Sequence, residues 1–155
     1  MITCNFEDGG RTLLRHVVVD TLVLKAKKIL LVKRAAKLLE GGKWGLIGGF
    51  VGRDEDIKEA AKREVFEETG YRIENITLLA INDRPDRPHE DRQNIAFVFF
   101  ANAKKKEGKS DWESTSQEWF PLDALPKEEE VAFDHYKDIK LYIEYKNKNV
   151  TLPII

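Results

Sequence analysis

Three glutamates in one short segment have a spacing that can place them on the same side of a helix. Glu67 and Glu68 follow Glu64 by three and four residues. At 100° per residue, the three side chains fall within a stripe roughly 120° wide. The same stripe contains the small apolar residues of the segment: Ile57, Ala60 and Ala61. Because the apolar stripe of a helix faces the core, the glutamates are predicted to face the protein as well.

A cluster of inward-facing carboxylates is costly unless something compensates its charge. Removing a carboxylate from water is unfavourable, and glutamates three or four residues apart repel one another. Divalent cations offset both costs, and carboxylate oxygens suit hard ions such as Mg²⁺ or Mn²⁺. The alternative is a solvated acidic turn paired with Lys58, Lys62 and Arg63, since charge runs usually face water. Because the lysines project from the opposite side of the helix, we favour metal binding.

The glutamates are expected on a helix that runs from about residue 57 to residue 69. Asp56 is a good N-cap residue, and Glu59 three residues later completes a capping-box pattern. Gly70 is the expected C-terminal stop. The chain therefore carries both a start signal and a stop signal for this helix.

The elements around this helix predict an α/β sandwich. Gly48 and Gly49 lie one short loop upstream, where the missing Cβ lets the backbone approach a ligand or metal. Strands are predicted over residues 15–24, 28–33, 43–47, 76–82, 94–101 and 117–120. A tight connection at 25–28, a charged turn at 104–110 and a final helix at 133–145 complete the order.

The composition favours one domain over residues 1–155. With 42% hydrophobic and 34% charged residues, the chain can bury a core and keep a solvated surface. A net charge of −1 provides no basic footprint for duplex nucleic acid. Cys4 is the only cysteine, which excludes an internal disulfide and a cysteine-based zinc site. No signal peptide and no apolar stretch of roughly 18 residues is present, so we expect a cytoplasmic protein without a membrane span.

Residues 49–71 resemble the Nudix box. That pattern is Gly, five residues, Glu, seven residues, Arg-Glu, an aliphatic residue, any residue, Glu-Glu, any residue, Gly and an aliphatic residue. The segment GFVGRDEDIKEAAKREVFEETGY matches it at the following positions: Gly49, Glu55, Arg63, Glu64, Val65, Glu67, Glu68 and Gly70. Tyr71 departs at the last aliphatic position, and Ile47 replaces a common proline just before the box. Weaker similarity extends over about residues 15–146.

The resemblance implies a Nudix fold, an α/β/α sandwich with a mixed β-sheet, and metal-dependent pyrophosphohydrolase activity. It assigns the following residues to the metal: Gly48, Glu55, Glu64, Glu67 and Glu68. Gly48 would contribute its carbonyl, and Glu55 would bind or orient the ion. Arg63 would hold the glutamates through a salt bridge. The implied ion is Mg²⁺, with Mn²⁺ as the alternative.

The reaction that the resemblance implies is attack of water on phosphorus. The metal would activate the water and neutralise charge on the bridging and leaving oxygens. Within the box, Glu64 or Glu67 is the expected general base. Some members of that family use an acidic residue from a later loop, and the candidates here are Glu90, Asp91 and Glu113.

The loop from residue 83 to residue 93 is the main indication of the substrate. ADP-ribose pyrophosphatases of the family tend to carry a proline some fifteen residues past the box with arginines nearby, and Pro85 fits that position. Arginine suits this role because its fork pairs with phosphate oxygens. The candidate substrate residues are Arg84, Arg87, Arg92 and Trp44. The alternatives are a proline-stiffened surface loop for the arginines and a core position for Trp44, Phe50 and Phe97.

Three functions are compatible with these patterns. The first is a pyrophosphatase acting on ADP-ribose or a similar nucleotide sugar, and the second is a nucleoside triphosphate or dinucleoside polyphosphate hydrolase. The third is a sensor that binds nucleotide without cutting it. It ranks last because sensors lose box glutamates or append a DNA-binding domain, whereas this chain keeps the glutamates and ends at Ile155. The expected partner is a small nucleotide, and the resemblance allows a homodimer.

Overall fold

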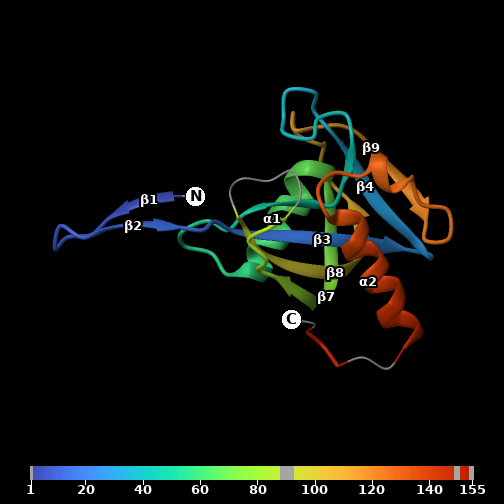
Figure 1. The fold of residues 1–155 in the computed structure, drawn as a ribbon. Coiled ribbons are helices and arrows are strands. Elements are labelled where there is room, and N and C mark those ends of the chain that lie inside the picture. The colour runs from blue at the N-terminus through green and yellow to red at the C-terminus, as the bar shows by residue number, and fades with distance from the viewer. Residues whose placement is uncertain (1, 88–92, 149–150, 154–155) are drawn as a thin grey trace.

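A seven-stranded mixed β-sheet forms the centre of the computed structural model, which describes residues 2–87, 93–148 and 151–153 (Figure 1). The strands are β3 (Val17–Lys25), β4 (Lys28–Arg34), β5 (Trp44–Gly45), β6 (Ile47–Phe50), β7 (Tyr71–Asn82), β8 (Ile95–Lys106) and β9 (Ser114–Pro121). They follow the order β5-β4-β3-β8-β7, with β6 beside β3 and β9 beside β4. β3 and β8 run parallel, and the other pairs of this sheet run antiparallel.

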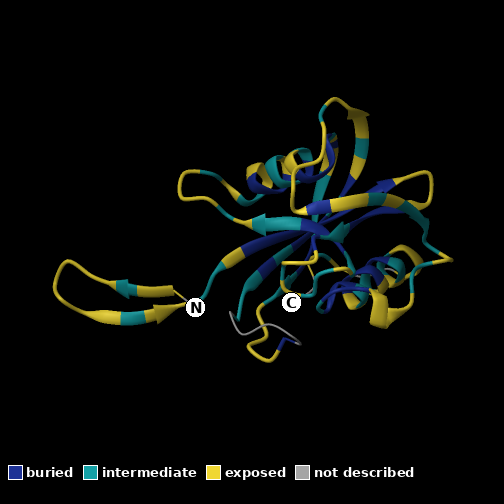
Figure 2. Ribbon diagram, turned by 90° about the horizontal axis from the view of Figure 1, so that it is seen from above, coloured by how far each residue is buried: buried dark blue, intermediate teal, exposed yellow. Residues whose placement is uncertain are grey.

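Helices cover both faces of the sheet. They are α1 (Ile57–Thr69), the short 3₁₀ helix η1 (Glu128–Glu130) and α2 (His135–Asn147). Because side chains alternate along β3, Val19 packs in one cluster with Ala60 of α1, whereas Leu22 packs in another with Ile139 of α2. Figure 2 shows the buried residues between these layers. The predicted α/β/α sandwich with a mixed sheet is confirmed. No helix in the described part of the chain is long and apolar enough to cross a membrane.

The local signals around α1 all correspond to structure. The helix begins after Asp56, whose carboxylate accepts hydrogen bonds from the backbone N–H groups of Lys58 (2.8 Å) and Glu59 (2.9 Å). The Glu59 carboxylate accepts in return from the Asp56 N–H at 3.1 Å, which completes the capping box. Gly70 ends the helix with a φ of 75°, in the left-handed region. The predicted bounds of this helix are confirmed.

The long pair of strands β7 and β8 corrects one prediction. Residues 104–110 are predicted as a charged turn, but β8 continues through Lys106, which pairs with Tyr71 at the start of β7. The charged side chains at this end of β8 are exposed. A solvated strand end and a solvated turn have the same composition, and only the partner strand distinguishes them.

The N-terminal hairpin is an element that the sequence analysis missed. β1 (Ile2–Asn5) and β2 (Arg11–Leu14) form a two-stranded sheet of their own. The hairpin projects from the body of the protein (Figures 1 and 2). Most of its residues are exposed on both faces, so its sequence lacks the alternation that marks a half-buried strand.

We expect the Asp56→Ala variant to lose about 1 kcal/mol of unfolding free energy, because two backbone N–H groups at the start of α1 lose their acceptor. Urea denaturation followed by circular dichroism measures the loss. Asp54→Ala is the matched control, since Asp54 is 89% exposed and lies outside the cap. Equal stability of the two variants would contradict the assignment of Asp56 as the N-cap.

Candidate active site

The three glutamates of α1 enter the protein to different depths. Glu68 is only 8% exposed, whereas the side chains of Glu64 and Glu67 are 15% and 49% exposed. The Glu68 carboxylate accepts hydrogen bonds from the Gly48 N–H at 3.0 Å and from the Ser114 hydroxyl at 3.1 Å. The predicted inward stripe is therefore confirmed for Glu64 and Glu68, while Glu67 lies at its solvent edge.

Strand β6 brings its backbone against these carboxylates. Gly48 and Gly49 lie opposite Asp20 and Val19 of β3. A Cβ on Gly49 would collide with the Glu64 carboxylate, and a Cβ on Gly48 would collide with the Val19 carbonyl. A side chain at Gly48 would therefore require the β3 backbone to move, whereas one at Gly49 would require the Glu64 carboxylate to shift.

Arg63 compensates several carboxylates at once. Its guanidinium donates to Glu55 at 2.6 Å, to Glu64 at 2.7 Å and to Glu67 at 3.1 Å. It also donates to the Phe50 carbonyl at 3.0 Å, which ties the helix to the end of β6. The salt-bridge role that the resemblance implies for Arg63 matches these contacts.

Burial and hydrogen bonding shift the pKa values of these carboxylates in opposite directions. Burial raises the pKa of Glu68 to about 8, and the hydrogen bonds from Gly48 and Ser114 offset only part of this effect. Burial also raises the pKa of Glu64, against the opposing effect of Arg63. In contrast, the hydrogen bonds from Arg63 lower the pKa of Glu55 to about 2. At the buried end of the cluster, the two hydrogen bonds to Glu68 thus do not make up for the loss of water around its carboxylate.

The donor set fits a hard divalent cation by its chemistry. Its carboxylates and the neighbouring backbone carbonyls are oxygen donors, and the destabilised charge of Glu68 is what a cation would relieve. No three acidic or histidine side chains of the described residues surround one point. Arg63 holds Glu55, Glu64 and Glu67, so a metal would have to share these carboxylates with the guanidinium. The metal-ligand assignments stay predictions.

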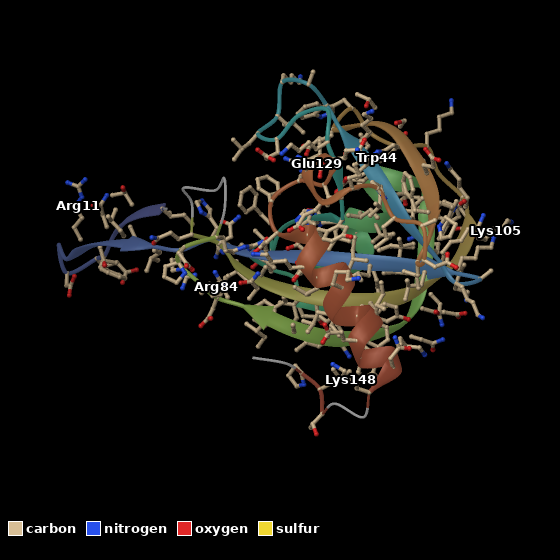
Figure 3. The ribbon with its side chains drawn as sticks, turned by 45° about the vertical axis from the view of Figure 1, so that its right-hand side comes forward. Arg11, Trp44, Arg84, Lys105, Glu129 and Lys148 are labelled. Carbon is tan, nitrogen blue, oxygen red and sulfur yellow. The ribbon has the colours of Figure 1, made fainter. Side chains whose placement is uncertain are left out.

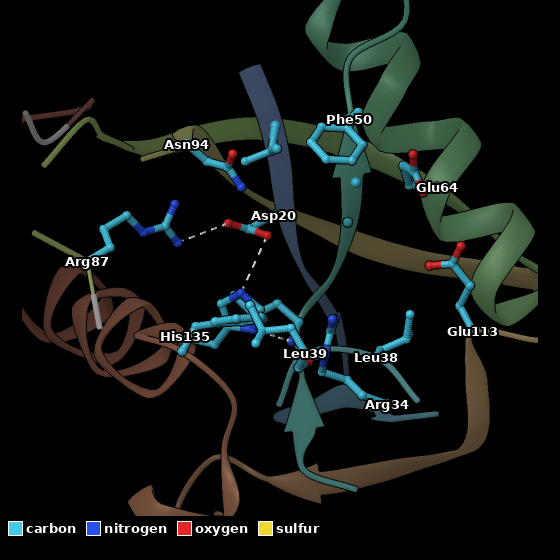
Figure 4. Close-up of a pocket in the computed structure, with 15 residues that line it drawn as sticks. Asp20, Arg34, Leu38, Leu39, Phe50, Glu64, Arg87, Asn94, Glu113 and His135 are labelled. Carbon is cyan, nitrogen blue, oxygen red and sulfur yellow. Dashed lines mark hydrogen bonds and ion pairs between the residues drawn. The ribbon is translucent and has the colours of Figure 1, made fainter. Parts of the chain in front are cut away.

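A cavity of about 370 Å³ opens beside this cluster (Figure 4). It is lined by Val18, Asp20, Arg34, Leu38, Leu39, Leu46, Gly48, Gly49, Phe50, Glu64, Arg87, Asn94, Glu113, Phe133 and His135. One end contains the acidic residues Glu64 and Glu113, and the other contains Asp20 and His135. The cavity is large enough for part of a nucleotide and joins the glutamates to a partly apolar wall.

Arg34 is a cavity residue that the sequence analysis missed. It ends β4, its Nε donates to the Leu39 carbonyl at 2.9 Å, and its guanidinium lies 5.0 Å from the Phe133 ring centre. Burial lowers its pKa, while nearby carboxylates, Glu68 first, oppose the effect. Arg34 remains a cation facing the acidic end. The sequence contained no local signal for this position, because the turn of the chain after β4 decides it.

A buried polar network closes the opposite end of the cavity. His135 accepts the Leu46 N–H at Nδ1 (3.0 Å), which leaves its Nε2 facing Asp20 at 3.6 Å. Arg87 donates to the Asp134 carboxylate at 2.7 Å and lies 3.8 Å from Asp20. Burial alone would raise the pKa of Asp20, but His135 and Arg87 hold it below its ordinary value. The network fastens the start of α2 to β3.

The predicted substrate residues do not gather in one place. Arg84 pairs with Asp86, and its side chain is exposed. Figure 3 shows it at the periphery of the protein. Arg87 lines the cavity, but its side chain is 4% exposed and its guanidinium grips Asp134. Its contacts give it a structural role, and its phosphate-binding role stays a prediction. Arg92 lies outside the described residues, as do the general-base candidates Glu90 and Asp91.

The aromatic candidates also separate. Trp44 packs edge-on against Phe120, with the ring centres 5.0 Å apart, in the core cluster on the α2 side. It is absent from the described lining of the cavity. Phe50 was expected in the core, but it is 46% exposed and forms part of that lining. β6 ends at Phe50, whose ring centre lies 5.1 Å from that of His16.

The NUDIX domain family model matches residues 14–142 of the chain. This chain belongs to the Nudix family. The match covers the whole central sheet, α1 and most of α2. The Nudix box therefore runs from β6 through α1 in the fold that the resemblance implied, and its residues Gly49 and Glu64 line the cavity.

Relatives of this Nudix hydrolase include an ADP-ribose pyrophosphatase from Methanocaldococcus jannaschii, 39% identical over 131 residues, 84% of this chain and 75% of that protein. A human 8-oxo-dGDP phosphatase is 31% identical over 115 residues, 72% of this chain and 33% of its own length. A bifunctional NMN adenylyltransferase/ADP ribose pyrophosphatase from Francisella tularensis, complexed with AMP and a Mn ion, superposes with a TM-score of 0.69. It is 26% identical and covers 85% of this chain and 42% of that chain.

Asp138 of α2 should make the protein less stable as the pH rises. Burial, together with Asp20 and Asp134, raises its pKa well above the ordinary 3.8, against the opposing effect of Arg87. The folded protein therefore retains a proton that the unfolded chain releases. The contribution of Asp138 to stability is fully present below pH 3.8, and it is lost as the pH rises through the pKa of Asp138 in the folded protein.

We expect Asp138→Asn to have a higher melting temperature than wild type at pH 8 and a smaller difference at pH 4, because the amide resembles the protonated acid. Thermal unfolding between pH 4 and 8 measures this. The exposed Asp123→Asn is the control and should follow the wild-type curve. Parallel curves for Asp138→Asn and wild type would contradict the assignment.

Proposed function

We propose that this Nudix hydrolase cuts the diphosphate of a nucleoside diphosphate linked to another group, with ADP-ribose as the leading substrate and Mg²⁺ or Mn²⁺ as the cofactor. The observation that carries the proposal is the buried Glu68 carboxylate close to Glu64, which lines the acidic end of the cavity. Burial raises the pKa of this carboxylate, and a bound cation would stabilise its charged form, which supports a cation-binding site. The relatives named for ADP-ribose support the substrate.

The roles of the box residues follow from their positions. Glu64, Glu67 and Glu68 would hold the metal with the Gly48 carbonyl, and Glu55 would orient the cluster through Arg63. When bound, the metal would lower the pKa of a water and neutralise charge on the phosphate oxygens. Arg63 keeps the glutamates of α1 in register with β6, because it also binds the Phe50 carbonyl.

The residues that line the cavity divide the remaining tasks. In the reaction, a water oxygen bonds to phosphorus, the bridging P–O bond breaks, and a carboxylate takes the proton of the water. Glu64 and Glu113 both line the acidic end, so each can reach a water there. We propose Arg34 as the guanidinium that pairs with the diphosphate oxygens, since it faces the same end.

The proposal is tested by hydrolysis with identification of the products. We expect ADP-ribose to give AMP and ribose 5-phosphate in Mg²⁺, no turnover in excess chelator, and recovery with Mg²⁺ or Mn²⁺. The panel should include other nucleotide sugars, diadenosine polyphosphates, 8-oxo-dGDP and nucleoside triphosphates. Full activity in chelator would refute the metal-dependent reaction. Turnover of triphosphates to monophosphate and pyrophosphate, with ADP-ribose ignored, would refute the substrate alone.

Glu68→Gln should lower kcat by orders of magnitude, because it removes a metal ligand's charge and keeps the shape of the side chain. It should also raise the melting temperature of the metal-free protein, because a neutral amide removes the cost of burying or protonating an acid that is ionised in the unfolded chain. Glu59→Gln is the matched control, since Glu59 is exposed and its amide would keep an oxygen for the capping box. Near-normal kcat of Glu68→Gln in saturating Mg²⁺ would count against Glu68 as a ligand.

A further inference from the structure

Trp112 is an exposed aromatic residue on a firmly attached loop. It is 59% exposed, more than any other large apolar side chain that the structure describes. Its backbone neighbours are anchored on both sides. The Asp111 N–H donates to the Glu67 carbonyl of α1 at 3.0 Å, and the Glu113 carbonyl accepts the Ala35 N–H at 2.9 Å. The loop therefore holds a costly apolar ring in water at a defined position.

That position is the rim of the cavity at its acidic end. Glu113, the next residue, lines the cavity together with Leu38 and Leu39 of the facing loop (Figure 4). Lys37, which precedes Leu38, places its ammonium 4.1 Å from the centre of the Trp112 ring. A cation and an aromatic ring thus stand together, each next in the chain to a residue that lines the cavity.

We propose that Trp112 and Lys37 form the subsite for the group beyond the diphosphate, a phosphate-linked sugar such as the second ribose of ADP-ribose. The inference rests on the proposed function. With the diphosphate at the acidic end of the cavity, a group attached to its far phosphate emerges over this rim. The apolar C–H face of a sugar packs against an indole ring, and an ammonium group donates to hydroxyl or phosphate oxygens. Lys37 contacts the ring, and because Trp112 is 59% exposed, ring surface remains for the sugar.

The subsite predicts an effect that depends on the ligand. α,β-Methylene-ADP and α,β-methylene-ADP-ribose resist cleavage at the diphosphate and differ by the distal ribose. We expect Trp112→Ala to weaken binding of the ribose-containing analogue by about five- to thirtyfold in isothermal titration with Mg²⁺. Binding of α,β-methylene-ADP should change less than twofold. Trp112→Phe should restore most of the lost affinity, because it keeps an aromatic face.

Lys109→Ala is the control, since Lys109 is exposed on the same loop and should leave both affinities unchanged. Equal effects of Trp112→Ala on the two analogues would overturn the subsite, because a distorted loop would weaken both. Unchanged binding of both analogues would overturn it as well. In either case, hydrolysis of ADP-ribose by wild type would leave the proposed function standing. A wild-type protein that neither cuts ADP-ribose nor binds its analogue would overturn both.

Discussion

The buried carboxylate of Glu68 is the constraint on which the rest of the site depends. It lies in the protein and accepts hydrogen bonds from a backbone N–H and a hydroxyl, which do not offset the effect of burial, so its pKa rises to about 8. Arg63 pairs with the outer carboxylates Glu55, Glu64 and Glu67, and we propose that a metal ion would compensate the inner one. The geometry of β6 serves the same end, because glycines there bring backbone atoms against Glu64 and Glu68. A helix with this cost is stable because a well-packed sandwich holds it in place.

The two helices of the sandwich are attached to the sheet by different kinds of contact, on either side of the cavity. On the α1 side, small residues such as Ala60 and Ala61 let the helix lie close to β3 and β8. On the α2 side, the Asp20, Arg87 and Asp134 network fastens the start of α2 beside the cavity. The cavity lies between these two attachments, so the acidic end and the polar end are held by different helices. A ligand in the cavity can therefore contact both the acidic end and the partly apolar wall, and the fold fixes the distance between them.

The sequence predicted the structure correctly where that structure depends on interactions between residues close together in the chain. The bounds and caps of α1 depend on residues within one or two helical turns, and they were predicted correctly. Arg34 and the network of Asp20 with Arg87 depend on contacts between distant segments, which no local pattern records. Arg87 looked like a free phosphate ligand because its partner Asp134 is far along the chain. The β1–β2 hairpin was missed because its exposed faces remove the alternation of a strand.

The most direct test of metal binding by Glu68 is a titration of Mn²⁺ into the metal-free protein, measured by isothermal titration calorimetry. If the buried carboxylate exists to hold a cation, wild type will bind Mn²⁺ saturably, and Glu68→Gln will bind it at least about tenfold more weakly. Glu59→Gln, on the exposed face of α1, should bind it like wild type. Equal Mn²⁺ affinity of wild type and Glu68→Gln would contradict the account, because the carboxylate would then have no part in metal binding.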